Sequence, residues 1–167
     1  MTTTAIFQNP ITQKIATFLS SIGLTIRSRV LEKGTFLPGL ALESGCILVD
    51  ENKLLYPGDI LHEAGHLAVS TPEERQQAGG NLAVGGGDEM AAIAWSYAAA
   101  LHISIDPAIV FHPQGYRNGS DSLLENFRAG HYLAVPLLQW MGLCYDAQKA
   151  AEQGTEAYPV MQRWLRE

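Results

Sequence analysis

The chain has 167 residues, of which 47% are hydrophobic and 17% charged, so it can bury the core of one compact domain and is not a disordered chain. Its 11 Lys and Arg residues against 17 Asp and Glu residues give a net charge of −6. No basic block is present, which argues against nucleic acid as a partner.

Residues 1–57 predict one helix followed by a small, mostly antiparallel sheet. Asn9-Pro10 is a typical helix start, and apolar residues then recur at helical spacing as far as residues 21–23. Residues 24–30 alternate between apolar and polar, the pattern of a half-buried strand. The other expected strands are 35–42, 45–49 and 54–56, the last pairing back across a turn at 50–53.

Residues 58–102 predict two helices joined by a long loop. Asp59 is a plausible N-cap for the first helix, which we expect to run to about residue 69. The stretch 71–87 is polar and then glycine-rich, so it predicts a loop with one short helical turn at 72–77. Its glycines do not form a phosphate-binding P-loop. The second helix covers 89–102.

Residues 103–167 predict a mainly helical C-terminal part of the same α+β domain. Ser122 to Glu125 has the pattern of a capping box that opens a helix. Gly130 and Pro136 divide the following apolar region, and residues 146–166 are helical in character with a break near Gly154 and Pro159. The aromatic residues expected in the core are Trp95, Tyr97 and Trp140.

Neither a membrane span nor a secretion signal is indicated. The longest apolar run, residues 90–101, is too short to cross a bilayer, and residues 1–9 lack the pattern of a signal peptide. Cys46 and Cys144 form no CxxC motif and are interpreted as buried thiols in a reducing compartment. We therefore expect a cytoplasmic protein that does not associate with membranes.

One motif carries chemistry: His62-Glu63-Ala64-Gly65-His66, an HExxH sequence. The expected number of chance occurrences of this motif is roughly 0.01 in a chain of this length and composition. On a helix His66 lies ~40° from His62, so both imidazoles share one face and suit two ligands of a tetrahedral zinc ion. Glu63 lies beside them at ~100°, where it can hold a water molecule. The residues of the opposite, apolar face are Ile60, Ala64 and Leu67. The alternative is two structural histidines on an amphipathic helix.

A catalytic zinc ion needs a third protein ligand, for which Glu89 is the first candidate. It opens the second helix and shares a face with Ile93, Ser96 and Ala100. Two of these three residues are small, so this face would allow close approach to the HExxH helix. A surface glutamate favoured by the helix dipole is the alternative. Asp88 competes as the ligand, although N-capping explains it without a metal ion.

The remaining polar candidates are weaker. His112 and Tyr116 lie on a loop after the second helix, and either is a candidate for stabilising an oxyanion or is simply exposed. His131 precedes an apolar segment and is a candidate for the surroundings of the site or for the core. His102 ends the second helix, where a structural role is favoured.

Residues 45–101 resemble the gluzincin metallopeptidases, and most closely the ImmA/IrrE family. Residues 45–50 are similar to that family's strand before the active-site helix, residues 59–67 to its HExGH helix, and Glu89 with Ala92 to its ExxA segment. The resemblance implies a minimal zincin-like domain in which His62, His66 and Glu89 bind zinc and Glu63 is the general base. This sequence departs from the family at Ala64, where a larger apolar residue is common.

These observations predict a zinc-dependent hydrolase, with a metallopeptidase that cleaves a protein or peptide as the first hypothesis. An extended substrate could pair along the strand near residues 46–49. One alternative is a zincin-fold module without catalysis that acts through a regulatory protein partner. The other is a metal-dependent amidase for a small substrate, which a closed pocket would favour over an open cleft.

Overall fold

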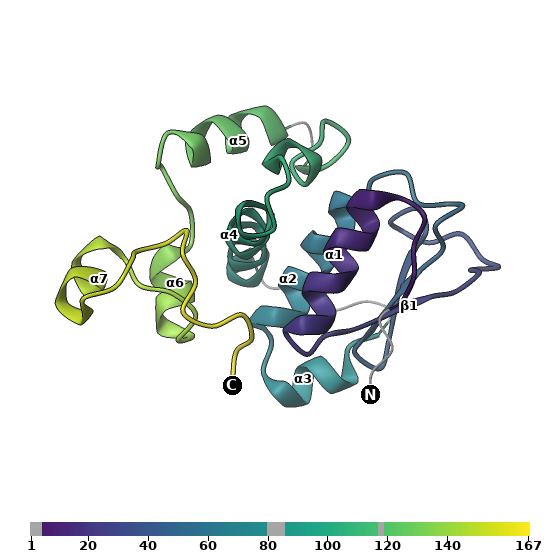
Figure 1. Cartoon of the computed structure of the whole chain (residues 1–167), viewed down its shortest axis with the longest axis horizontal. Coiled ribbons are helices and arrows are strands. Elements are labelled where there is room, and N and C mark those ends of the chain that lie inside the picture. Colours follow the sequence, from purple (N-terminus) through teal and green to yellow (C-terminus); the bar gives the residue numbers. More distant parts are fainter. Residues whose placement is uncertain (1–4, 80–85, 117–118) are drawn as a thin grey trace.

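The computed structural model describes residues 5–79, 86–116 and 119–167, and these ranges form an α+β fold with seven α-helices and one three-stranded sheet. The elements in chain order are α1 (Pro10–Ser21), β1 (Thr25–Ser28), β2 (Leu40–Glu43), β3 (Cys46–Val49), α2 (Gly58–Val69), α3 (Pro72–Gln77), α4 (Gly86–His102), a 3-10 turn η1 (Pro107–Ile109), α5 (Ser120–Arg128), α6 (Val135–Trp140) and α7 (Ala147–Gln153). The sheet and α7 lie at opposite ends of the long axis, with α4 between them (Figure 1).

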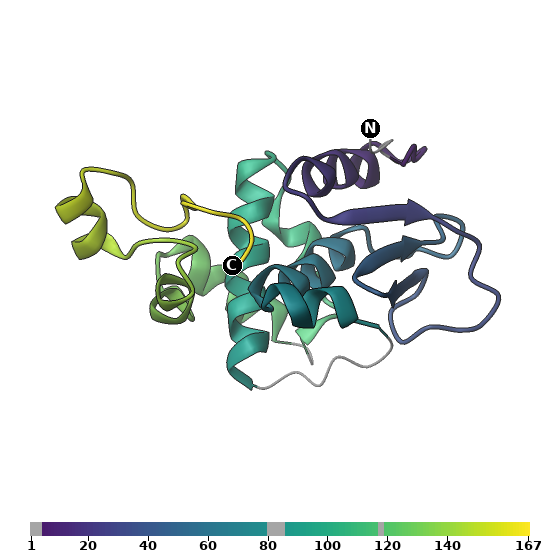
Figure 2. The ribbon, with the colours of Figure 1, turned by 90° about the horizontal axis from the view of Figure 1, so that it is seen from below.

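Helix α1 begins as the sequence predicts. The Asn9 side chain accepts hydrogen bonds from the backbone N–H groups of Ile11 and Thr12, and Pro10 occupies the first helical position, where a missing N–H costs nothing. Its apolar face, which includes Ile15 and Phe18, is buried. Figure 2 shows α1 beside the sheet, and the chain continues from α1 directly into β1.

The sheet is mixed rather than mostly antiparallel, so that prediction is wrong. Its order is β1-β3-β2, with β1 parallel to β3 and β2 antiparallel to β3. Because β3 is the central strand, paired on both sides, residues 46–49 have no free edge for a substrate. Side-chain alternation does not reveal this, since it gives the same pattern for either strand direction.

Residues 35–39 and 54–56, which the sequence predicts in strands, lie outside the sheet. Residues 35–39 precede β2 without strand structure, and a Cβ atom on Gly39 would stand 2.5 Å from the Leu54 backbone nitrogen. The Asp50 carbonyl oxygen accepts hydrogen bonds from Lys53 N (3.0 Å) and Leu54 N (2.9 Å), which confirms the turn at 50–53. This turn sends residues 54–56 towards α2 instead of back along the sheet.

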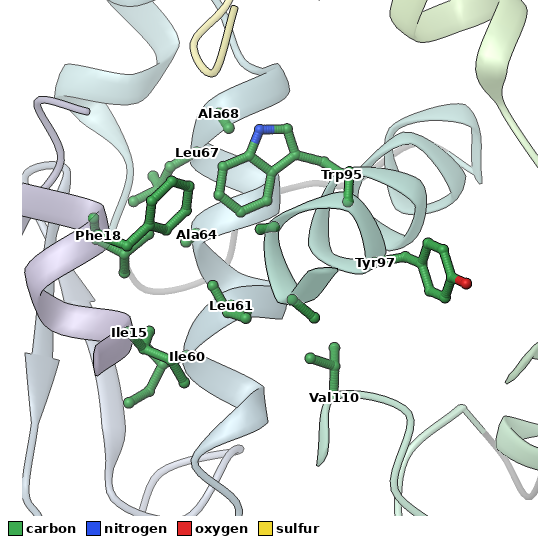
Figure 3. Close-up of a cluster of buried hydrophobic side chains, with 14 of the residues drawn as sticks. Ile15, Phe18, Ile60, Leu61, Ala64, Leu67, Ala68, Trp95, Tyr97 and Val110 are labelled. Atoms are coloured by element: carbon green, nitrogen blue, oxygen red, sulfur yellow. The ribbon is translucent and has the colours of Figure 1, made fainter. Parts of the chain in front are cut away.

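Helix α2 is buried at the centre of the fold. It packs against α1, β3 and α4, and Figure 3 shows its apolar side chains, among them Leu61 and Leu67, in one cluster with Phe18 of α1 and Trp95 of α4. Fully burying a side chain of this size stabilises a fold by about 1.5–3 kcal/mol. The apolar face of α2 therefore fixes the rotation of the helix and with it the direction of the HExxH side chains.

The C-terminal part departs most from prediction. Helix α5 begins at Ser120, not at a capping box on Ser122, and its N-cap Gly119 makes no side-chain hydrogen bond. Helix α7 ends at Gln153 with Gly154 as its C-cap, and the residues that follow are not helical. Trp140 is 72% exposed, so its placement in the core is wrong, and the Arg166 guanidinium lies 5.1 Å from its ring centroid.

Both cysteines are free thiols, Cys144 buried and Cys46 half-buried. Burial raises the pKa of Cys144 to about 12, which keeps this thiol protonated and unreactive. Within the described ranges, none of the helices combines the length and apolar character that crossing a bilayer requires.

Candidate metal centre

The candidate centre forms where α2 and α4 approach each other most closely. Gly65 of α2 faces Ala92 of α4, and a Cβ atom on Gly65 would stand 2.7 Å from the Ala92 carbonyl oxygen. His66 follows Gly65 directly, and Glu89 lies one helical turn before Ala92. The glycine of the motif thus lets α4 bring Glu89 against the two histidines.

Three side chains meet there with one ligand atom each. The Nε2 atoms of His62 and His66 are 3.1 Å apart, and the Glu89 carboxylate oxygens lie 3.2 Å from His62 Nε2 and 3.0 Å from His66 Nε2. Ligand atoms at about 2.0–2.1 Å around a tetrahedral zinc ion stand about 3.3 Å from each other. Two imidazole nitrogens and a carboxylate in such a triangle fit the donor set of zinc, so the predicted ligands come together.

Electrostatics within the triangle favour the charged form of Glu89. Hydrogen bonds from His62 and then His66 hold the pKa of the Glu89 carboxyl well below its ordinary value, and burial opposes them only in part. The Glu89 side chain is 41% exposed, whereas those of His62 and His66 are 16% and 8% exposed. The triangle is therefore open to solvent on the side of Glu89.

Glu63 lies on α2 between the two histidines and is half-buried. Burial raises the pKa of its carboxyl, an effect that the neighbouring imidazoles of His66 and His62 oppose. Its carboxylate is not a member of the three-residue ligand cluster. Its position beside His62 and His66 leaves its role as a base a prediction.

Tyr116 contacts the candidate ligand His62 on its other nitrogen. The Tyr116 hydroxyl lies 3.0 Å from His62 Nδ1, and the two rings meet edge to face with centroids 5.4 Å apart. A hydroxyl can either donate or accept a hydrogen bond, so it can serve either tautomer of the imidazole. Burial raises the pKa of Tyr116 far above its ordinary value and keeps the phenol protonated.

His112 lies at α2 but faces a different residue. Its Nε2 atom is 2.6 Å from Asp59 Oδ1, both residues are buried, and its ring stacks on Tyr56 with centroids 4.0 Å apart. Asp59 is therefore not the N-cap of α2: the helix begins at Gly58, with Pro57 at the N-cap position.

Asp59 is the residue at the site that the sequence reasoning missed. On the helical wheel it lies ~60° from His62, between His66 and Glu63, so helix periodicity alone places it on the ligand face. The helix-breaking Pro57-Gly58 pair before it favoured the capping interpretation.

The other candidates lie outside the triangle. Asp88 is exposed in the first turn of α4, which begins at Gly86, so it is neither the N-cap nor a member of the ligand cluster. His102 ends α4 as expected, and its ring packs against Phe18 and Trp164. It stands 13 residues from Glu89, or roughly 20 Å along the helix. His131 is exposed after α5.

Two arginines from distant parts of the chain fix the C-terminal end of α2. Arg75 of α3 donates to the carbonyl oxygens of Leu67 and Ser70, at 2.8 and 3.0 Å. Arg166 donates its backbone N–H to Ala68 O and its guanidinium to Val69 O, at 2.9 and 3.2 Å. The last carbonyl groups of the helix, which have no partner within it, are satisfied in this way.

No protein-family model matches the chain, and comparisons with curated proteins and with solved structures likewise give no match.

Proposed function

We propose that the protein is a zinc-dependent hydrolase, and specifically a metallopeptidase with a zincin-like fold of the ImmA/IrrE type. One observation carries the proposal: His62, His66 and Glu89 place their ligand atoms within 4.8 Å of one another, with Glu63 beside them. Two histidines one helical turn apart, a carboxylate from a second helix and a separate glutamate are the parts that a hydrolytic zinc site needs.

Each residue has a distinct role in this proposal. His62, His66 and Glu89 would hold the ion, which when bound would supply Lewis-acid chemistry to a carbonyl group and a water molecule. The Glu63 carboxylate accepts the proton of the attacking water and returns it to the leaving amine. Of the two oxyanion candidates on the loop that faces α2, His112 is buried against Asp59, so Tyr116 is the one proposed to donate a hydrogen bond to the oxyanion. Of these two, the Tyr116 hydroxyl is nearer to a ligand in the structure.

A protein or peptide is the proposed substrate. The exposure of Glu89 favours a site that opens to solvent over one enclosed in a pocket. Of the strands in the described ranges, β2 lies at an edge of the sheet and is antiparallel to its neighbour β3. We propose that an extended segment pairs along β2, in place of the central residues 46–49.

The alternatives remain a regulatory module without catalysis and an amidase for a small substrate. Glu63 argues against the first, because a purely structural zinc site has no use for a carboxylate that is not a ligand. The open side at Glu89 argues against the second.

Peptide-end mapping tests the proposal. Zinc-loaded protein is incubated with a complex mixture of unfolded proteins, and new peptide termini are identified by mass spectrometry. We expect termini that appear with zinc and disappear when a chelator removes it. Zinc-loaded protein that produces no termini above those of the chelated control would contradict a general peptidase.

A further inference from the structure

We propose that the Asp59–His112 pair is a positioning device: it fastens the loop 110–116 to α2 so that the Tyr116 hydroxyl stays on His62 Nδ1. The inference deepens the proposed function, because His62 is one of its metal ligands. It assigns the pair a role through Tyr116 and requires no contact between the pair and a substrate.

The first anchor of the loop is the contact between His112 and Asp59. The 2.6 Å separation of His112 Nε2 and Asp59 Oδ1 is a short, charge-assisted hydrogen bond in a buried setting. Stacking on Tyr56 fixes the plane of the imidazole. Among the described residues His112 Nδ1 has no hydrogen-bond partner, so the hydrogen bonding of this ring depends on Asp59.

The second anchor is the contact between Tyr116 and His62. Tyr116 has a φ of +55°, a left-handed conformation that is strained for a bulky side chain. Its ring also packs edge to face on Phe111, with centroids 5.4 Å apart. The surrounding contacts therefore hold Tyr116 in a conformation that it would not adopt alone.

Both anchors lie on the same turn of α2. Asp59 and His62 are three residues apart and share a face of the helix, and His112 and Tyr116 are four residues apart on the loop. Between them, Gly115 N donates to His112 O at 3.0 Å, and a Cβ atom on Gly115 would stand 3.5 Å from His112 Cε1. The turn packs against the His112 ring, so the position of that ring determines the position of the Tyr116 backbone.

The partner of a ligating histidine sets its tautomer and its ring orientation, and its loss typically weakens metal binding 10- to 100-fold. Loss of the Asp59–His112 pair should act on His62 in the same way as loss of the Tyr116 hydroxyl. Equal effects of the two changes on His62 distinguish positioning from a general loss of stability, because independent losses of stability would add when the changes are combined.

The first test uses metal-free protein at pH 8 and the nitrogen chemical shifts of the His62 ring. The double variant Asp59→Ala/His112→Phe removes the pair without leaving an unpaired buried carboxylate. We expect this double variant to change the His62 Nδ1 signal as Tyr116→Phe does. The single variant His112→Gln keeps a donor for Asp59 and should show the wild-type signal. His102→Phe, at the far end of α4, is the matched control. A wild-type His62 signal in the folded double variant would overturn the proposal.

The second test is a mutant cycle on zinc affinity, measured by competition with a chromogenic chelator. Tyr116→Phe alone, Asp59→Ala/His112→Phe alone and the combination of all three changes should each weaken binding to a similar extent, about 10- to 100-fold. If the loss of zinc affinity in the combined variant equals the product of the two separate losses, the pair does not act through Tyr116. If the wild-type protein binds no zinc, the proposed function fails, and the His62 signal in metal-free protein still decides the positioning role.

Discussion

Gly65 lies directly against Ala92, and no side chain larger than hydrogen fits between the two backbones at this point. The contact stands one residue before His66 on α2 and one turn after Glu89 on α4. The separation of the two helices, and therefore the size of the ligand triangle, depends on this glycine.

Gly65→Ala should lower the free energy of unfolding and weaken zinc binding. Alanine gains about 1 kcal/mol of helix propensity, but its methyl group meets the backbone of Ala92, which has no rotamer to change, and overpacking costs about 1–3 kcal/mol. We expect a net loss of up to about 2 kcal/mol in urea unfolding. Gly34→Ala is the control, since nothing lies within 4 Å of that position. Unchanged zinc affinity in Gly65→Ala would show that the contact does not set the triangle.

Glu63→Gln should separate metal binding from catalysis. The substitution keeps the size of the side chain and removes its ability to take a proton, while the three ligand side chains are untouched. We expect wild-type zinc content and a loss of peptide hydrolysis of at least about 100-fold. Asp88→Asn, an exposed carboxylate on the neighbouring helix, is the control and should remain active. Full activity in Glu63→Gln would eliminate it as the base.

Arg75→Ala should destabilise the C-terminal end of α2. The guanidinium donates to Leu67 O and Ser70 O and also to Arg166 O, at 2.7 Å, so its loss leaves several carbonyl groups without partners. We expect the free energy of unfolding to fall by about 2–3 kcal/mol. Arg163→Ala removes an exposed ion pair with Glu167 and should cost less than about 0.5 kcal/mol. Equal effects of the two substitutions in thermal or urea unfolding would contradict the capping role.

Asp50→Asn should make stability less dependent on pH in the acid range. The hydrogen bond from Leu31 N, followed by the charge of Lys53, lowers the pKa of the Asp50 carboxyl below its ordinary value of 3.8. A carboxyl with a lowered pKa in the folded state stabilises the fold above its unfolded pKa and loses that contribution as pH falls through the folded pKa. Urea unfolding should show a wild-type advantage at pH 7 that shrinks below pH 3.8. An advantage that does not change with pH would contradict this assignment.

The ligand triangle followed from sequence because its determinants are local. The HExxH spacing places two histidines on one helix face, and small residues after Glu89 indicated that the second helix could approach closely. The approach itself occurs through Gly65 and Ala92. Ser96, one of the residues predicted to share the face of Glu89, is fully buried, and its hydroxyl donates a hydrogen bond to Ile93 O at 2.8 Å.

The features that escaped prediction depend on contacts between distant residues. The parallel pairing of β1 with β3 joins segments on either side of β2, and an alternating pattern carries no information on strand direction. The C-terminal residues after Gly154 are not helical, and they return to the core, where Trp95 Nε1 donates to Trp164 O at 2.9 Å and Tyr158 OH to Ala94 O at 2.8 Å. Such tertiary hydrogen bonds outweigh the helix propensity of the segment.

The metal content of protein purified without added metal tests the central claim most directly. We expect about one zinc ion per chain in the wild type and in Asp88→Ala, and loss of zinc in His62→Ala, His66→Ala and Glu89→Ala. Zinc retained in Glu89→Ala would remove that residue from the ligand set. A folded wild-type protein that binds no zinc even after reconstitution would contradict the metal centre itself.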